Sequence, residues 1–165
     1  MDRDTLKKTI IIAFDDVRRP SMDSMIRVSP DVLDVAGAEA VVSVLANEGR
    51  WQDISLRALV SQRGDLYYLS SKGLHYVFPA ALIAVLCRYD ECDTLPDSLI
   101  SMLSIPAKSS EQMNSLWSLF TRDQLVAVRE WVAWVAEAYP DDLGQRDRKL
   151  ILDNINSSMS LLHDC

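Results

Sequence analysis

The sequence predicts an all-α protein that folds as one domain over residues 1–165. Several segments carry apolar residues at helical spacing, and only five glycines and six prolines are available for the turns of a β-rich fold. With 48% hydrophobic and 25% charged residues, the composition is that of an ordinary globular domain. We expect about seven helices around one core, without a repeat, a low-complexity tract or an internal domain boundary.

The first third of the chain predicts two helices joined by a polar connection. Residues 4–17 gather their apolar side chains on one face, and Pro20 ends this helix because the residue before a proline avoids helical dihedrals. Residues 20–30 are expected to be a polar connection. In residues 34–47, valines are compatible with a strand, but the alanines and the absence of strict alternation favour a helix.

The middle of the chain is dense in aromatic and aliphatic residues. A short helix is expected at 55–62 with Ser55 as its cap, and a longer one at 71–89. Pro79 either kinks that longer helix or lies in the first turn of a second one. We expect the centre of the core to include Trp51, Tyr67, Tyr68, Leu69, Tyr76, Phe78, Leu82 and Leu86.

The last third predicts four more helical segments. Residues 95–103 and 109–120 form the first two. Thr121 and Gln124 make the capping-box pattern that opens the best helix of the chain, whose apolar face includes Trp131 and Trp134. Residues 145–163 form the final helix. Both tryptophans are expected to be core residues, because large aromatics at this spacing usually fill a core instead of lining a ligand pocket.

The charge balance restricts the partners. Seventeen basic and 24 acidic residues give a net charge of −7, which argues against nucleic acids and anionic membranes and favours a basic protein partner. The charged N-terminus and the short apolar runs contain no signal peptide and no transmembrane span. The expected location is therefore the cytoplasm.

Catalytic and metal-binding patterns are weak. Cys87, Cys92 and Cys165 suggest neither a disulfide framework nor a zinc site, and His75 lies in an apolar segment without a nucleophile pattern around it. The acidic clusters at 15–16, 90–93 and 141–142 are expected to be solvated surface. We expect no catalytic residue, no metal and no cofactor.

Several motifs in a fixed order resemble an uncharacterised bacterial domain family. They are I-x-x-A-F-x-x-V-x-R-P at 10–20, W-Q-D-I at 51–54, the aromatic segment 65–86, L-P-D-S-L-I at 95–100, and L-F-T-R-D-Q followed by a helix to residue 132. The chain departs from the family pattern at 71–72 and 77–78. Small acidic families of this kind resemble toxin-immunity proteins, which are encoded beside secreted toxins and protect the producing cell.

This resemblance implies a non-enzymatic binding protein, an immunity protein that neutralises a cognate secreted toxin by direct contact. The acidic segment Asp90, Glu91, Asp93 and Asp97 is the expected contact site for a basic toxin. The alternatives are a regulatory or scaffold protein, or a small hydrolase that uses surface carboxylates.

Overall fold

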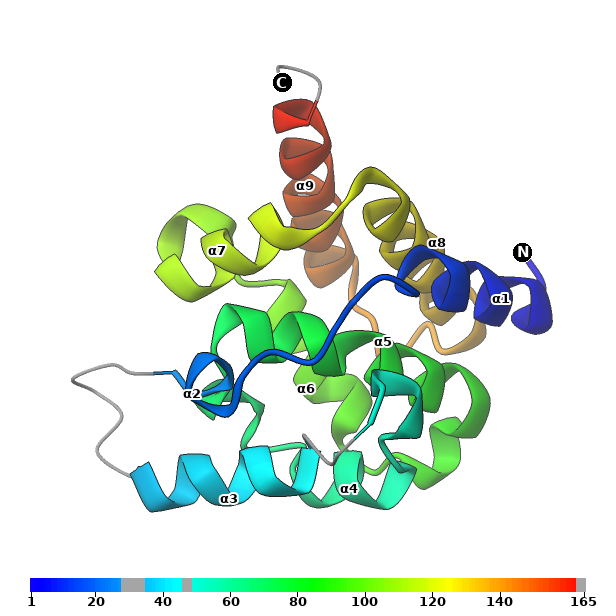
Figure 1. Cartoon of the computed structure of the whole chain (residues 1–165). Coiled ribbons are helices and arrows are strands. Elements are labelled where there is room, and N and C mark those ends of the chain that lie inside the picture. Colours follow the sequence, from blue (N-terminus) through cyan, green and yellow to red (C-terminus); the bar gives the residue numbers. More distant parts are fainter. Residues whose placement is uncertain (28–34, 46–48, 163–165) are drawn as a thin grey trace.

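The fold is all-α, as predicted. The computed structural model describes residues 1–27, 35–45 and 49–162. Over these residues the chain forms nine α-helices and four 3₁₀ turns, and an isolated antiparallel bridge joins Ile26 to Leu69 (Figure 1). The α-helices are α1 (Arg3–Ala13), α2 (Met22–Met25), α3 (Val35–Leu45), α4 (Leu56–Ser61), α5 (Ser71–Arg88), α6 (Leu95–Leu103), α7 (Glu111–Leu119), α8 (Arg122–Ala138) and α9 (Gln145–Leu161). The 3₁₀ turns are η1 (Trp51–Asp53), η2 (Leu66–Tyr68), η3 (Tyr89–Glu91) and η4 (Ala107–Ser109).

Helix α5 is the centre of the molecule (Figure 1). It contacts α1, α2, α4, α6, α7 and α8, and most of its side chains are buried. Pro79 lies inside this single continuous helix, so the sequence alternative of two separate helices is wrong. Enclosure on all sides stabilises the helix enough to offset the hydrogen bond that a proline removes. No helix among the described residues is long and apolar enough to cross a membrane.

Helix α8 packs against both α1 and α5, and its start is the predicted capping box. Thr121 Oγ1 accepts the backbone N–H of Gln124, and Gln124 Oε1 accepts the backbone N–H of Thr121. Trp131 is fully buried and donates its indole N–H to the carbonyl of Leu82 on α5 at 3.1 Å. Trp134, by contrast, is only partly buried and lies at the edge of the core, so the helix buries a narrower face than its sequence suggests.

The aromatic core joins the N-terminal helix to the centre of the fold. Phe14, Phe78 and Phe120 come from three distant segments, and their ring centroids are 5.4–6.4 Å apart. Of the residues predicted for the centre of the core, two lie outside it: Tyr67 has 50% of its surface exposed, and Tyr68 is only half-buried. The two rings, both on η2, contact each other at a tilt of 33° with centroids 4.2 Å apart, and Tyr68 packs against the edge of the core.

Helix α2 was not predicted, because a four-residue helix inside a polar segment shows no periodicity. It buries Met25, and its end is pinned to the start of α5. The N–H of Ser70 donates to the carbonyl of Met25 at 2.7 Å, and Gly73 approaches the same carbonyl closely. A Cβ atom at Gly73 would lie 2.6 Å from that oxygen, so this crossing requires glycine.

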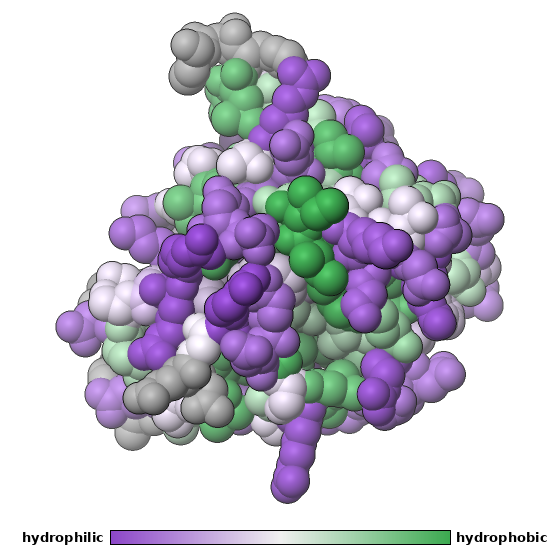
Figure 2. Space-filling view, turned by 45° about the vertical axis from the view of Figure 1, so that its right-hand side comes forward, coloured by the Kyte–Doolittle hydropathy of each residue, from purple (hydrophilic) through white to green (hydrophobic). Residues whose placement is uncertain are grey.

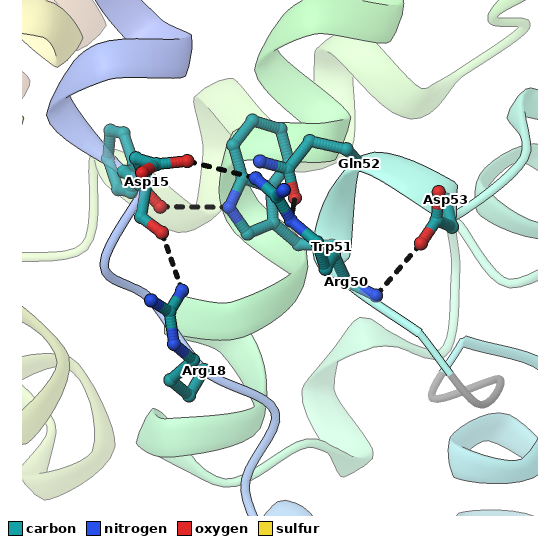
Figure 3. A network of polar contacts seen from close by, with 7 residues as sticks. Asp15, Arg18, Arg50, Trp51, Gln52 and Asp53 are labelled. Atoms are coloured by element: carbon teal, nitrogen blue, oxygen red, sulfur yellow. Dashed lines mark hydrogen bonds and ion pairs between the residues drawn. The ribbon is translucent and has the colours of Figure 1, made fainter.

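Helix α1 ends at Ala13, four residues before its predicted end, because polar contacts capture the following turn (Figure 3). The carbonyl of Phe14 accepts the indole N–H of the buried Trp51 at 2.9 Å. Arg50 and Arg18 both bind Asp15, at its carboxylate (2.9 Å) and its carbonyl (2.6 Å), respectively. These contacts hold the α1–α2 connection against η1.

Candidate functional site

The predicted acidic segment forms the turn between α5 and α6. Asp90, Glu91, Asp93 and Asp97 are all exposed. The segment turns sharply because Asp93 adopts a left-handed conformation with φ of 51°, and Pro96 lies in the first turn of α6. Asp90, Glu91 and Asp93 therefore lie on the connection, and Asp97 lies beside it in the first turn of α6.

The four carboxylates are not equivalent. Glu91 accepts two hydrogen bonds from the guanidinium of Arg88, at 2.6 and 2.7 Å, which lower the pKa of its carboxyl group. Asp93 pairs with Arg63 at 2.6 Å. Within the described residues no ion pair involves Asp90 or Asp97. Asp90 and Asp97 thus carry the negative charge that this turn can offer to a partner.

Two stacked tyrosines lie beside this turn, and sequence reasoning missed them. The rings of Tyr89 and Tyr139 are 3.5 Å apart between centroids and nearly parallel, and Trp134 contacts Tyr139 edge-on. The hydroxyl of Tyr89 donates to the carboxylate of Asp142 at 2.6 Å. Burial raises the pKa of Tyr89, and the bond to Asp142 and the charge of Asp97 raise it further.

We call the two stacked tyrosines and the carboxylates near them the acidic–aromatic surface, which consists of Tyr89, Tyr139, Asp90, Asp97 and Asp142. It joins the α5–α6 turn to the α8–α9 turn, although Tyr89 and Tyr139 are far apart in the sequence. Fifty residues separate the tyrosines, and no local pattern connects them. Only the general density of carboxylates at 90–93 and 141–142 could have suggested that the two turns meet.

One thiol near this surface, that of Cys92, is unsuited to nucleophilic chemistry. Cys92 is fully buried, and burial raises the pKa of its thiol to about 11, so it is protonated at neutral pH. Cys87 is half-buried, and Cys165 lies outside the described residues. Over the residues that the structure describes, no three histidine, cysteine or carboxylate side chains gather as metal ligands would.

A second polar site lies where α8 begins. His75 on α5 and Gln124 on α8 are joined by a 2.9 Å hydrogen bond, and Gln124 also donates to Asp16 after α1 at 3.5 Å. A cavity of about 320 Å³ opens beside them, bordered also by Arg18 and Lys72. From the sequence, Gln124 was predicted only as part of a helix cap, and His75 only as a histidine without a catalytic role.

The capping box determines the tautomer of His75. The side-chain oxygen of Gln124 accepts the backbone N–H of Thr121, so it is also an acceptor toward the histidine. His75 therefore donates through Nε2, and neutral imidazole keeps its lone pair on Nδ1. Burial lowers the pKa of His75, against the opposing effects of Gln124 and the charge of Asp16. These hydrogen bonds link α5, α8 and the segment that follows α1.

An apolar groove of about 330 Å³ is lined by residues of α1, η1, α4 and α5. Ile11, Ile54 and Ile83 contribute to its walls, and Lys7 and Arg88 border it. Figure 2 shows the molecule from nearer the side on which α1 lies, and on this face hydrophobic side chains gather among hydrophilic ones. Ile12 on the same helix is strongly exposed.

Comparison with known proteins identifies a family but no activity. Neither the curated proteins nor the solved structures contain a match to this chain. A model described as a family of unknown function (DUF6714) matches residues 2–156, from α1 into α9. This match spans all the motifs on which the predicted resemblance rests. The chain therefore belongs to this family of unknown function, DUF6714.

Proposed function

We propose that this protein is a non-enzymatic binding module that recognises a basic protein partner through the acidic–aromatic surface. The observation that carries the proposal is the Tyr89–Tyr139 stack bordered by the carboxylates of Asp90, Asp97 and Asp142. Aromatic faces attract guanidinium and ammonium groups, and adjacent carboxylates pair with them. Tyrosines surrounded by polar groups are also frequent centres of binding energy.

The specific role we propose is that of an immunity protein that neutralises a cognate secreted toxin by contact. The net charge of −7 would steer a basic toxin toward the complex and speed its association. Neutralisation by occlusion needs a stable scaffold and a complementary surface, but no catalytic group. The mechanism is therefore the burial of cationic toxin residues against the tyrosine stack.

The test begins with the protein encoded by the adjacent gene. The two chains are expressed together, their complex is purified, and the free toxin is tested for growth inhibition with and without this protein. Rescue of growth accompanied by a stable complex supports the proposal. Protection without any physical contact, for example by removal of a toxin product, would show that the protein is not a binding module.

The surface itself is tested with charge-matched variants. Asp90→Asn with Asp97→Asn changes the net charge by the same amount as Asp23→Asn with Glu39→Gln, two exposed carboxylates on α2 and α3. We expect the first pair to slow association about 3- to 10-fold at low salt and to flatten the salt dependence. The second pair should change association much less. If the two pairs slowed association equally, the net charge of the protein, and not the position of Asp90 and Asp97, would control the association rate.

The tyrosine stack calls for a separate variant. Tyr139→Ala removes one ring of the stack and should weaken the complex about 30-fold or more, mainly through faster dissociation. Glu91 and Asp93 are poor positions for this test, since their replacement would release Arg88 and Arg63. An unchanged dissociation constant for Tyr139→Ala would remove the stack from the interface.

A further inference from the structure

The apolar groove beside α1 differs from the rest of the molecule in its charge. Four of the aliphatic side chains that line it are only half-buried: Ile11, Ile54, Leu56 and Ile83. The charged residues in its lining are both basic, Lys7 and Arg88, and no acidic residue lines it in the part of the chain that the structure describes. The whole chain, by contrast, has 24 acidic and 17 basic residues. The groove is therefore an apolar surface with a positive border on a negatively charged protein.

The two basic residues differ in whether their charge is already paired. The guanidinium of Arg88 donates two hydrogen bonds to the carboxylate of Glu91, at 2.6 and 2.7 Å. Among the described residues no ion pair involves Lys7, which is exposed on α1. The ammonium group of a lysine lies at the end of a flexible four-carbon stem, so that of Lys7 can move toward an anion in the groove without breaking an ion pair. Lys7 thus supplies the free positive charge at this site.

We infer that this groove binds a medium-chain carboxylic acid in its ionised form. The alkyl chain covers the half-buried side chains of Ile11, Ile54 and Ile83 and removes their exposed surface from water. The carboxylate pairs with the ammonium group of Lys7. A cationic head group in the same place would meet Lys7 and Arg88 as like charges. The inference uses none of the residues of the acidic–aromatic surface and does not depend on the proposed partner.

The volume of the groove sets the length of the alkyl chain. An engineered apolar cavity of about 150 Å³ holds one benzene molecule, which is about six non-hydrogen atoms. At the same packing, the groove of about 330 Å³ takes about 13 non-hydrogen atoms. Decanoate has about this size, and it is the probe that we choose.

The sign of the head group provides the decisive comparison. Decanoate and decyltrimethylammonium have nearly the same alkyl chain and opposite charges. On average, a protein with a net charge of −7 attracts the cation, so a preference for the anion indicates a site with local positive charge. At low salt, and below the concentration at which either compound forms micelles, we expect decanoate to bind at least threefold more tightly.

Binding is followed by the methyl signals of isoleucine in ¹³C-labelled protein, assigned through single Ile→Val replacements. The signals of Ile11, Ile54 and Ile83 should shift together and saturate as decanoate is added. Ile12 is the internal control, because it is 77% exposed on the same helix and does not line the groove. Its signal should stay nearly in place. An equally large shift of Ile12 would show adsorption to any exposed apolar side chain and would overturn the inference.

Two neighbouring lysines provide matched variants. Lys7 and Lys8 are both exposed on α1 and carry the same charge, but only Lys7 lines the groove. Lys7→Gln should weaken decanoate binding about two- to fivefold, the range for an exposed ion pair, and should remove most of the preference for the anion. Lys8→Gln should keep that preference. The inference would be wrong if the cation bound as tightly as decanoate, if the groove signals did not move at millimolar decanoate, or if both variants weakened binding equally.

Discussion

Replacement of Trp131 by alanine should be one of the most damaging single changes in this chain. Trp131 is 0% exposed on α8, which packs against α1 and α5, and its indole N–H is bonded to the carbonyl of Leu82. Truncation of a buried tryptophan costs about 3–5 kcal/mol, with the larger values where the surroundings cannot collapse. Helices on both sides hold this site open, so we expect about 4–5 kcal/mol. A typical domain has only about 5–15 kcal/mol in total.

Trp134→Ala is the matched control, one helical turn further along the same helix. Trp134 is half-buried and contacts Tyr139 edge-on, so its loss should cost about 1–2 kcal/mol. Urea unfolding followed by far-ultraviolet circular dichroism gives both values from the midpoints, provided that the slopes agree. The packing argument would be refuted if Trp131→Ala left the midpoint unchanged, or if Trp134→Ala cost as much.

Three further predictions concern single positions. Because the pKa of His75 is lowered in the folded protein, the unfolded chain takes up more protons than the folded one, and stability should fall as the pH drops below about 6.5. His75→Gln should reduce that loss of stability between pH 7.5 and 5.5 in urea titrations. Gly73→Ala should cost about 3 kcal/mol because its Cβ meets the carbonyl of Met25, whereas Gly64→Ala, with open space around it, should be nearly neutral in the same assay. Cys92 should react with a thiol reagent only as fast as the chain opens, which peptide mass spectrometry can follow; rapid labelling of the folded protein would contradict its burial.

Local chemistry made several elements predictable. Ser55 caps α4, and Thr121 opens α8 with a complete capping box. The predicted bounds 95–103 agree with α6, because Pro96 at its start and the apolar spacing act within a few residues. Such signals depend on neighbours along the chain, and a sequence displays those neighbours directly.

The candidate site was less predictable because its decisive contacts are between distant segments. The carboxylate count identified the α5–α6 turn, but the pairing of Asp93 with Arg63 bridges thirty residues, and the stack of Tyr89 on Tyr139 bridges fifty. Trp134 shared its periodic face with Trp131, yet only the placement of neighbouring helices decides which of the two is enclosed. Periodicity predicts a buried face, not its width.

The contact between α1 and α8 has a consequence for synthesis on the ribosome. Residues 3–13 form their apolar face first, but the helix that covers it begins only at residue 122. At about 5–20 residues per second, the intervening hundred or so residues take roughly 5–20 s to emerge. During that time α1 has no permanent partner on this side. The nascent chain must stay soluble with its first helix uncovered, and the polar residues Lys7, Lys8 and Thr9 on α1 help to keep it so.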